Sequence, residues 1–243
     1  MSEHENIHRI FELQKSLKSE QQAYLNKYLS NAPRWVLESI QVVTKDKQTV
    51  FVEENFPADN VYILTEGTVR AIDYRIQGVA YDYMWFHPIN VFGAMEIFFN
   101  MPKYMTTLMT VTPCTFLVLS SSHYEKWIWG DKNALQMETI SMGNYLLEQN
   151  RKGRVFLFLQ GMDRIIYMFV EYYEQRSTEE KIALDMSRQE LAERSGLSMK
   201  TVNRAVKKIE ECKYISRDGR KIIISKAQYR KMKDYLEPIV DRS

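Results

Sequence analysis

A chain of 243 residues, 45% of them hydrophobic, is long enough for two domains that each have a packed core. No apolar run approaches the roughly 18 residues of a membrane span, and residues 1–18 are too polar for a signal peptide, so we expect a cytoplasmic protein with no membrane partner. Cys114 and Cys212 are the only cysteines, too few for a zinc finger or an iron–sulfur cluster, and we expect no metal and no cofactor.

The net charge of +2 says little about partners, but the charge is unevenly distributed along the chain. Residues 187–226 carry eleven basic and five acidic side chains, a charge of +6, whereas the rest of the chain has a charge of −4. This asymmetry favours a polyanion-binding module attached to a different kind of domain.

The first elements predicted are helices, and strands follow them. Apolar residues recur at three- and four-residue steps over residues 7–37, which predicts helices interrupted at Pro33. Short runs of β-branched and aromatic residues, separated by turn signals, fill residues 48–119. Gln77-Gly78 suggests a tight hairpin, and no helix-length crossover separates the runs. We therefore predict a sandwich or small barrel.

A long helix is predicted over residues 131–157, where apolar residues return at helical spacing. A stripe at alternating four- and three-residue steps is typical of a coiled-coil dimer seam, although this stripe includes polar positions. The predicted seam residues are Leu135, Thr139, Met142, Leu146 and Gln149. The alternative is an amphipathic helix that packs only on its own domain.

The stretch with most of the positive charge has helical spacing that is interrupted at Gly196. Ser187 and Glu190 have the spacing of a capping box, and Gly196 can supply the left-handed backbone that ends a helix. Ser198 can cap a second helix over residues 199–211, whose apolar residues repeat at helical steps. Two short helices joined by a tight turn that contains glycine form a helix-turn-helix.

The outward face of this second helix is polar and basic. An α-helix fits the major groove of B-DNA, where lysine and arginine donate to guanine and asparagine can bridge adenine, so we expect base contacts from Lys200, Asn203 and Arg204. The hairpin signal Asp218-Gly219 predicts a wing that touches phosphates. The predicted DNA-binding residues are Arg188, Gln189, Ser198, Met199, Lys200, Thr201, Asn203, Arg204, Lys207, Arg217, Arg220 and Lys221.

The order of a β domain, a long helix and a winged helix-turn-helix resembles the CRP/FNR family of bacterial transcription regulators over roughly residues 48–226. The run "VYILTEGTVRA" is similar to the family's strand and turn around a glycine, here Gly67. The run "SRQELAERSGLSMKTVNRAVKKIEECKYI" is similar to its DNA-reading motif, and "DRII", at residues 163–166, resembles the start of the helix that opens its DNA domain.

The resemblance implies an α+β chain of three parts. N-terminal helices and a cupin-like double-stranded β-helix, similar to cyclic-nucleotide-binding domains, would form a sensor over residues 1–130. A central dimerisation helix would occupy residues 131–157 and a winged helix-turn-helix residues 158–243. Two reading helices would then enter successive major grooves of a palindrome. The expected partners are double-stranded DNA, a second copy of the chain, an unidentified small-molecule effector and, as a further candidate, RNA polymerase.

The effector segment departs from the cyclic-AMP-binding members of the family. There a Gly-Glu pair holds the ribose and an Arg-Ser pair holds the phosphate; here Gly93 is kept, but Ala94 and Tyr104-Met105 stand at the other positions. A buried phosphodiester without its arginine would be poorly compensated, so we expect another effector, and the aromatic and methionine-rich segment would suit an apolar one. The candidate effector-binding residues are Gly93, Ala94, Met95, Glu96, Tyr104, Met105 and Thr106.

Other functions stay open at this point. The β domain could have lost its ligand and serve only as the scaffold of a ligand-independent regulator. A cupin-type enzyme with an accessory helix-turn-helix would need metal ligands, but His87 and His123 are widely separated and no HxH spacing occurs, so we expect no enzyme and no catalytic residues. A nonspecific nucleic-acid coat would bind DNA with strong salt dependence and no sequence preference.

Overall fold

The computed structural model describes residues 3–73, 81–175, 180–184, 186–219 and 221–240. The chain divides into two compact units, Met1–Tyr145 and Leu146–Ser243. The long helix α6 (Lys132–Phe158) contributes residues to both of them. The three-part division at residues 130 and 157 stays a prediction, because the division into two units falls inside the long helix.

Helices open unit 1, as the periodicity predicts. They are α1 (Glu3–Ser16), α2 (Ser19–Tyr28) and α3 (Arg34–Ser39), followed later in the chain by α4 (Ala94–Phe98) and α5 (Ser121–Ile128). Pro33 lies directly before α3, where its missing N–H costs no helical hydrogen bond. The sequence predicted this break at Pro33 but not the earlier one between α1 and α2.

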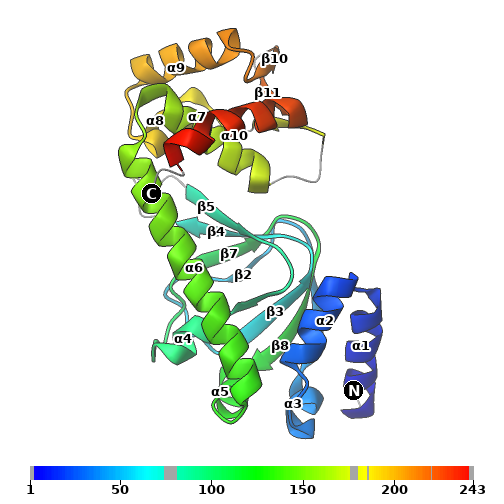
Figure 1. Ribbon diagram of the computed structural model, residues 1–243. Helices are drawn as coiled ribbons and strands as arrows, with labels where there is room; N and C mark the ends of the chain where they lie inside the picture. The colour runs from blue at the N-terminus through cyan, green and yellow to red at the C-terminus, as the bar shows by residue number, and fades with distance from the viewer. Residues whose placement is uncertain (1–2, 74–80, 176–179, 185, 220, 241–243) are drawn as a thin grey trace. The chain divides into compact units, whose positions relative to one another are not determined.

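Two four-stranded sheets with antiparallel pairing form the β part of unit 1, in the orders β1-β8-β3-β6 and β2-β7-β4-β5 (Figure 1). The strands are β1 (Gln41–Lys45), β2 (Val50–Val52), β3 (Asn60–Glu66), β4 (Val69–Asp73), β5 (Tyr81–Phe86), β6 (Asn90–Phe92), β7 (Thr107–Thr110) and β8 (Cys114–Ser120). The predicted turn at Gln77-Gly78 lies outside the described residues, but β4 and β5 on either side of it do pair.

Side-chain alternation along β3 and β8 gives unit 1 two layers of core. Ile63 lies opposite Leu117 in the sheet, and both side chains are buried against the helices. The next pair, Leu64 and Phe116, points to the other face and is buried with residues of the second sheet. Because successive strand residues point to opposite faces, this sheet is apolar on both sides.

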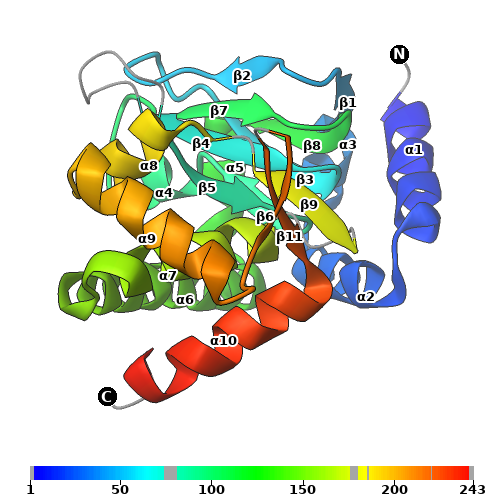
Figure 2. The ribbon, with the colours of Figure 1, turned by 90° about the horizontal axis from the view of Figure 1, so that it is seen from above.

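Unit 2 is a winged helix-turn-helix. Its elements are α7 (Gly161–Gln175), β9 (Lys181–Leu184), α8 (Arg188–Ser195), α9 (Met199–Glu211), β10 (Ser216–Asp218), β11 (Lys221–Ser225) and α10 (Lys226–Val240). Phe169 of α7 and Val206 of α9 are fully buried in one core. Figure 2 shows that the hairpin β10-β11 directly follows α9 and leads into α10. The strand β9 and the helix α10 were not predicted from the sequence.

Candidate nucleic-acid interface

The first helix of the motif, α8, is capped at both ends as predicted. The Ser187 N–H donates to Glu190 Oε2 (2.7 Å) and the Glu190 N–H donates to Ser187 Oγ (3.1 Å), which completes a capping box. After the helix, Gly196 has a φ of +64°, and the Leu197 N–H donates to the Ala192 carbonyl (3.2 Å). These are features of a Schellman motif, which fixes the direction in which the chain leaves α8.

Arg164 of α7, which sequence reasoning missed, holds the end of α8 in place. Its Nη1 donates to the Ser195 carbonyl (2.8 Å) and its Nε to the Leu159 carbonyl (3.1 Å). Ser195 is fully buried, so its carbonyl needs a protein partner at this helix end. Local patterns cannot reveal this contact, because Arg164 and Ser195 are 31 residues apart in the sequence.

The second helix, α9, has one buried and one exposed face. Its buried residues are Val202, Ala205, Val206 and Ile209, as the spacing predicts. The exposed face contains Lys200, Asn203, Arg204 and Lys207. Within the described chain, no hydrogen bond or ion pair engages the side chains of Lys200, Asn203 and Arg204. Three donor-bearing side chains therefore share one solvent-facing side of a rigid helix.

The start of α9 contains the other predicted contact residues of this helix. The Thr201 N–H donates to Ser198 Oγ (3.2 Å), and the two hydroxyl oxygens lie 2.9 Å apart, so Ser198 is the cap that the sequence predicted. Met199 is 39% exposed beside them. On the other helix of the motif, Gln189 is exposed in the first turn of α8. Helix N-termini present backbone N–H groups that suit phosphate oxygens.

The hairpin after α9 has the geometry that the sequence predicts for a wing. Asp218 pairs with Lys221, and Gly219, directly after Asp218, has a positive φ of +59° of the kind that tight hairpin turns require. Lys221 and Arg217 are exposed, while Arg220 lies outside the described residues. Strand β9 pairs with β11 and ties the wing to the core of the unit.

Arg188, the first residue of α8, lies beside the wing. Arg217 Nε forms an ion pair with Glu210 Oε2 (2.8 Å), which joins the wing to α9. Burial and, secondly, the charge of Arg217 lower the pKa of Arg188. The Arg188 Nη1 atom is buried without a hydrogen-bond partner among the described residues. Two guanidinium groups beside one carboxylate leave positive charge that a DNA phosphate could neutralise.

The candidate effector segment comes together around α4. Gly93 has a φ of +91°, and a Cβ there would lie 2.6 Å from the Asn60 carbonyl oxygen, so the position requires glycine. Ala94 is fully buried, and Glu96 is 7% exposed. The Met105 N–H donates to Glu96 Oε1 (3.2 Å), which links the two halves of the predicted segment.

Tyr104 is the residue that the sequence analysis places at the position of the family's phosphate-binding arginine. Its hydroxyl donates to the Asn60 carbonyl (2.6 Å) and accepts from the Asn60 N–H (3.2 Å). Burial raises the pKa of Tyr104, which keeps the side chain neutral. Of the other predicted residues, Met95 and Thr106 are half-buried and Met105 is exposed. Glu96 is the one charged member of the predicted set, and its charge is negative.

Two members of the predicted seam on α6 have another role in the structure. Leu135 and Met142 pack against the core of unit 1, because the first half of α6 covers that core. Thr139 is exposed and its hydroxyl donates to the Leu135 carbonyl (2.8 Å). Gln149 is half-buried, and Leu146 is 46% exposed. The predicted stripe thus mixes inward and outward positions.

Near the middle of α6, three exposed apolar side chains lie beside or within the predicted stripe. Ile140 is 55% exposed, Leu147 is 69% exposed, and Leu146 adds to the same stretch. A Cβ at Gly143, between them, would meet no atom within 4 Å. A seam on α6 would therefore use Ile140, Leu146 and Leu147 in place of Leu135 and Met142.

The described residues contain no group of three or more His, Cys, Asp or Glu side chains that could hold a metal ion. No helix in the described ranges has both the length and the apolar character to cross a bilayer. Cys114 is buried and Cys212 is exposed, and both are free thiols.

Comparisons with known proteins match both units. The cyclic nucleotide-binding domain family matches residues 42–128, and the family of Crp-like helix-turn-helix domains matches residues 163–229. A curated relative, the CRP-like cAMP-activated global transcriptional regulator of Mycobacterium tuberculosis, is 23% identical over 185 residues, which cover 74% of this chain and 81% of the relative.

Solved structures share the fold at low identity. The c-di-GMP responsive global regulator CLP of Xanthomonas campestris matches with a TM-score of 0.60 and 19% identity, covering 83% of this chain and 97% of that chain. A CRP/FNR-family regulator of Thermus thermophilus matches with a TM-score of 0.61 and 20% identity, covering 81% and 98%. With the two family matches and the capped, winged helix pair, the chain belongs to the CRP/FNR family of transcription regulators, with a cyclic-nucleotide-binding-type β domain and a DNA-binding helix-turn-helix domain.

Proposed function

We propose that the protein is a dimeric regulator that reads a palindromic operator through α9 and responds to an effector other than a cyclic nucleotide. The exposed face of α9 carries the proposal. Lys200, Asn203 and Arg204 project from a helix whose other face is buried, and no partner within the described chain satisfies them. In a major groove, these residue types pair with guanine and adenine edges.

Selection of bound sequences from a random DNA pool tests the proposal. The purified chain is used at fixed salt, with and without cell extract from its source. A palindromic consensus supports a dimeric reader, and a consensus that needs extract supports an effector. A ligand-independent regulator would give the same consensus in both conditions. No consensus in either condition would contradict sequence-specific reading and favour a nonspecific coat.

Replacing Arg204 with alanine should weaken binding to the selected operator by about 1–3 kcal/mol, because a base contact is lost. Folding should be unaffected, since the side chain is exposed. Fluorescence anisotropy with labelled operator measures the change. As a contrast, Lys221→Ala on the wing should weaken binding to specific and to nonspecific DNA equally. It should also reduce the slope of log affinity against log salt concentration by about 1. If Arg204→Ala binds the operator as tightly as the unaltered chain does, Arg204 makes no base contact.

Leu147 gives the test of the dimer. It is 69% exposed on α6, and an aspartate there would place a charge in the proposed seam. Leu147→Asp should raise the dimer dissociation constant at least about 30-fold, as loss of an interface anchor does. Sedimentation equilibrium measures it, with Gln136→Asp, at an exposed polar position of α6, as the matched control. Equal dissociation constants for the two variants would rule out a seam at Leu147.

The effector segment predicts no binding of cyclic AMP. Glu96 places a carboxylate at the Met105 amide, and the neutral Tyr104 offers no charge for a phosphate. Titration of the full chain with cyclic AMP should give no saturable heat up to about 1 mM, because a buried phosphate would be uncompensated. Saturable binding at micromolar concentrations would show that another positively charged side chain neutralises the phosphate, and it would overturn the expectation.

A further inference from the structure

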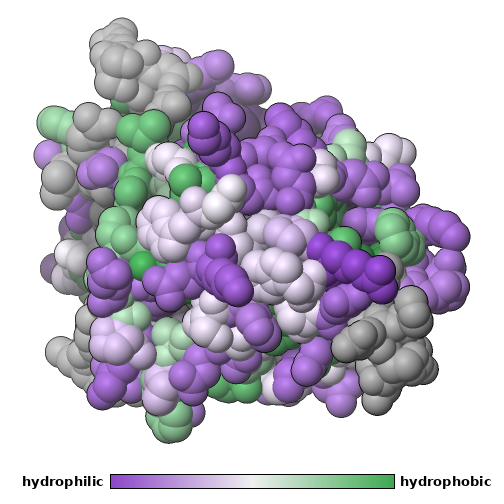
Figure 3. All heavy atoms as spheres, turned by 90° about the horizontal axis from the view of Figure 1, so that it is seen from below, coloured by the Kyte–Doolittle hydropathy of each residue, from purple (hydrophilic) through white to green (hydrophobic). Residues whose placement is uncertain are grey.

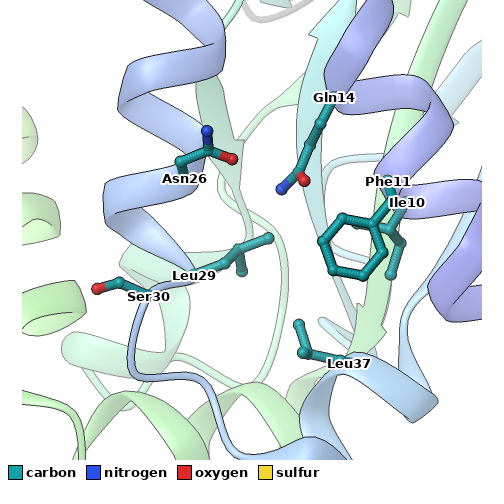
Figure 4. Close-up of a pocket in the computed structure, with 7 residues that line it drawn as sticks. All are labelled: Ile10, Phe11, Gln14, Asn26, Leu29, Ser30 and Leu37. Carbon is teal, nitrogen blue, oxygen red and sulfur yellow. The ribbon is translucent and has the colours of Figure 1, made fainter.

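A pocket of about 200 Å³ opens among the three N-terminal helices. Its apolar lining consists of Ile10 and Phe11 from α1, Leu29 after α2 and Leu37 from α3 (Figure 4). On the face in Figure 3, apolar residues lie in several areas between polar ones. An engineered apolar cavity of about 150 Å³ binds benzene, so this volume suits one aromatic ring with a small substituent.

Gln14 provides an unused polar group inside this pocket. The residue is only 8% exposed, and its amide points into the space among the lining residues (Figure 4). No side-chain hydrogen bond joins Gln14 to another described residue. The amide can both donate and accept hydrogen bonds, so a ligand hydroxyl or carbonyl group in the pocket could pair with it.

The remaining polar residues restrict the charge of the ligand. Ser30 Oγ already donates to the Lys27 carbonyl (2.9 Å) and accepts from Asn133 Nδ2 (3.3 Å). Asn26 is exposed at the rim. None of the seven lining side chains is charged, so an ionic ligand would lose its hydration without compensation.

The geometry points to a second ligand site, in which α1, α2 and α3 bind a small neutral aromatic molecule through its ring and hydrogen-bond its hydroxyl or carbonyl group with Gln14. This site is separate from the effector segment around Glu96 and Tyr104. It does not rest on the proposed DNA reading, because its test measures no DNA. Binding would also stabilise unit 1, since Leu29 belongs to the core of that unit as well.

Calorimetric titration of the full chain with p-cresol and with toluene tests the site. The two probes have similar rings, but only p-cresol has a hydroxyl group. We expect saturable one-to-one binding, with toluene about tenfold weaker, as the loss of one buried hydrogen bond predicts. Nuclear Overhauser effects should connect the p-cresol protons with the methyl groups of Leu29 and Leu37. No saturation, or contacts elsewhere, would overturn the proposal.

Gln14→Leu isolates the hydrogen bond. In this variant the affinity for p-cresol should fall to that for toluene, while toluene binding should not weaken. Glu12→Gln, on the exposed side of the same helix, is the matched control and should keep the tenfold preference. A p-cresol preference that survives Gln14→Leu would overturn the role of the amide. The comparison of the two probes on the unaltered chain keeps the test valid if a variant does not fold.

Discussion

Replacing Gly67 with alanine is expected to lower the free energy of unfolding of unit 1 by about 4 kcal/mol. Gly67 follows β3 and has a φ of +95°. A Cβ there would lie 2.4 Å from the Pro113 carbonyl oxygen, 2.6 Å from Cys114 Sγ and 2.9 Å from Cys114 Cα. The substitution therefore combines an unfavourable backbone conformation with overlap against a fully buried neighbour.

Tryptophan fluorescence can measure this change in unit 1 alone. All four tryptophans of the chain, at positions 35, 85, 127 and 129, belong to that unit. Gly130→Ala is the matched control, because its new Cβ would come no closer than 3.5 Å to another atom. Its effect in denaturant titration should stay below about 1 kcal/mol. Equal losses for the two variants would show that the contact with Pro113 and Cys114 is not what requires glycine.

The helix-turn-helix could be predicted almost residue by residue, because its signals are local. The box of Ser187 and Glu190, the positive φ of Gly196 and the cap at Ser198 each act within a few residues of the chain. The four buried positions of α9 also follow directly from the helical period. This motif, together with the β domain and the long helix that precede it, suggested the CRP/FNR family, and the family matches confirm it.

The parts that were missed depend on contacts distant in the sequence. Strand β9 has only four residues, and the alternation of its buried Ile182 and Leu184 is too short to separate a strand from a loop. It forms because β11, far along the chain, pairs with it. Arg164 likewise acts on Ser195 from another helix. Tertiary partners, which no local pattern reveals, decide both cases.

The central helix shows a different limit of sequence reasoning. Leu135 and Met142 satisfy coiled-coil spacing, yet they pack on the core of unit 1. Periodicity shows that a helix has an apolar face, but it does not identify what covers that face. The neighbouring Leu147, which the stripe omitted, is the more exposed apolar residue, and only the structure distinguishes the two faces.

Glu138 is expected to make unit 1 less stable as the pH rises from 5 to 8. This residue, on α6, is only 3% exposed. Burial raises its pKa to about 7, although a hydrogen bond with Tyr28 opposes the shift. Its Oε1 atom has no hydrogen-bond partner within the described ranges. The ionised form would thus be a buried charge without a cation.

The direction of the effect follows from proton binding. Below pH 4.5, the carboxyl group is protonated in the folded and the unfolded chain, so its ionisation takes nothing from the free energy of unfolding. Between pH 4.5 and 7 the unfolded chain releases its proton first, which favours unfolding, and above pH 7 the loss levels off. The shift in pKa corresponds to about 3 kcal/mol in total, of which about 2–3 kcal/mol falls between pH 5 and 8.

Glu138→Gln removes the ionisation and isolates this contribution. From pH 5 to pH 8, the unfolding free energy of the variant should rise relative to that of the unaltered chain by about 2–3 kcal/mol. Tryptophan fluorescence in denaturant measures both proteins. Glu125→Gln, at an exposed carboxylate of α5, is the matched control for the loss of a charge. Parallel pH profiles for Glu138→Gln and the unaltered chain would contradict the expectation.

The neighbours of Glu138 make this test specific. Among the described residues, the titratable groups that interact with it are Tyr24 and Tyr28 of α2 and Tyr124 of α5, and burial raises the pKa of each. All three therefore stay neutral between pH 5 and 8, so their ionisation adds nothing to the pH dependence that is assigned to Glu138. Tyr28 and Tyr124 also hydrogen-bond to each other (2.8 Å) in the same buried cluster. A charge on Glu138 should consequently loosen α2 first, which would appear as faster amide exchange in α2 at pH 8 that Glu138→Gln abolishes.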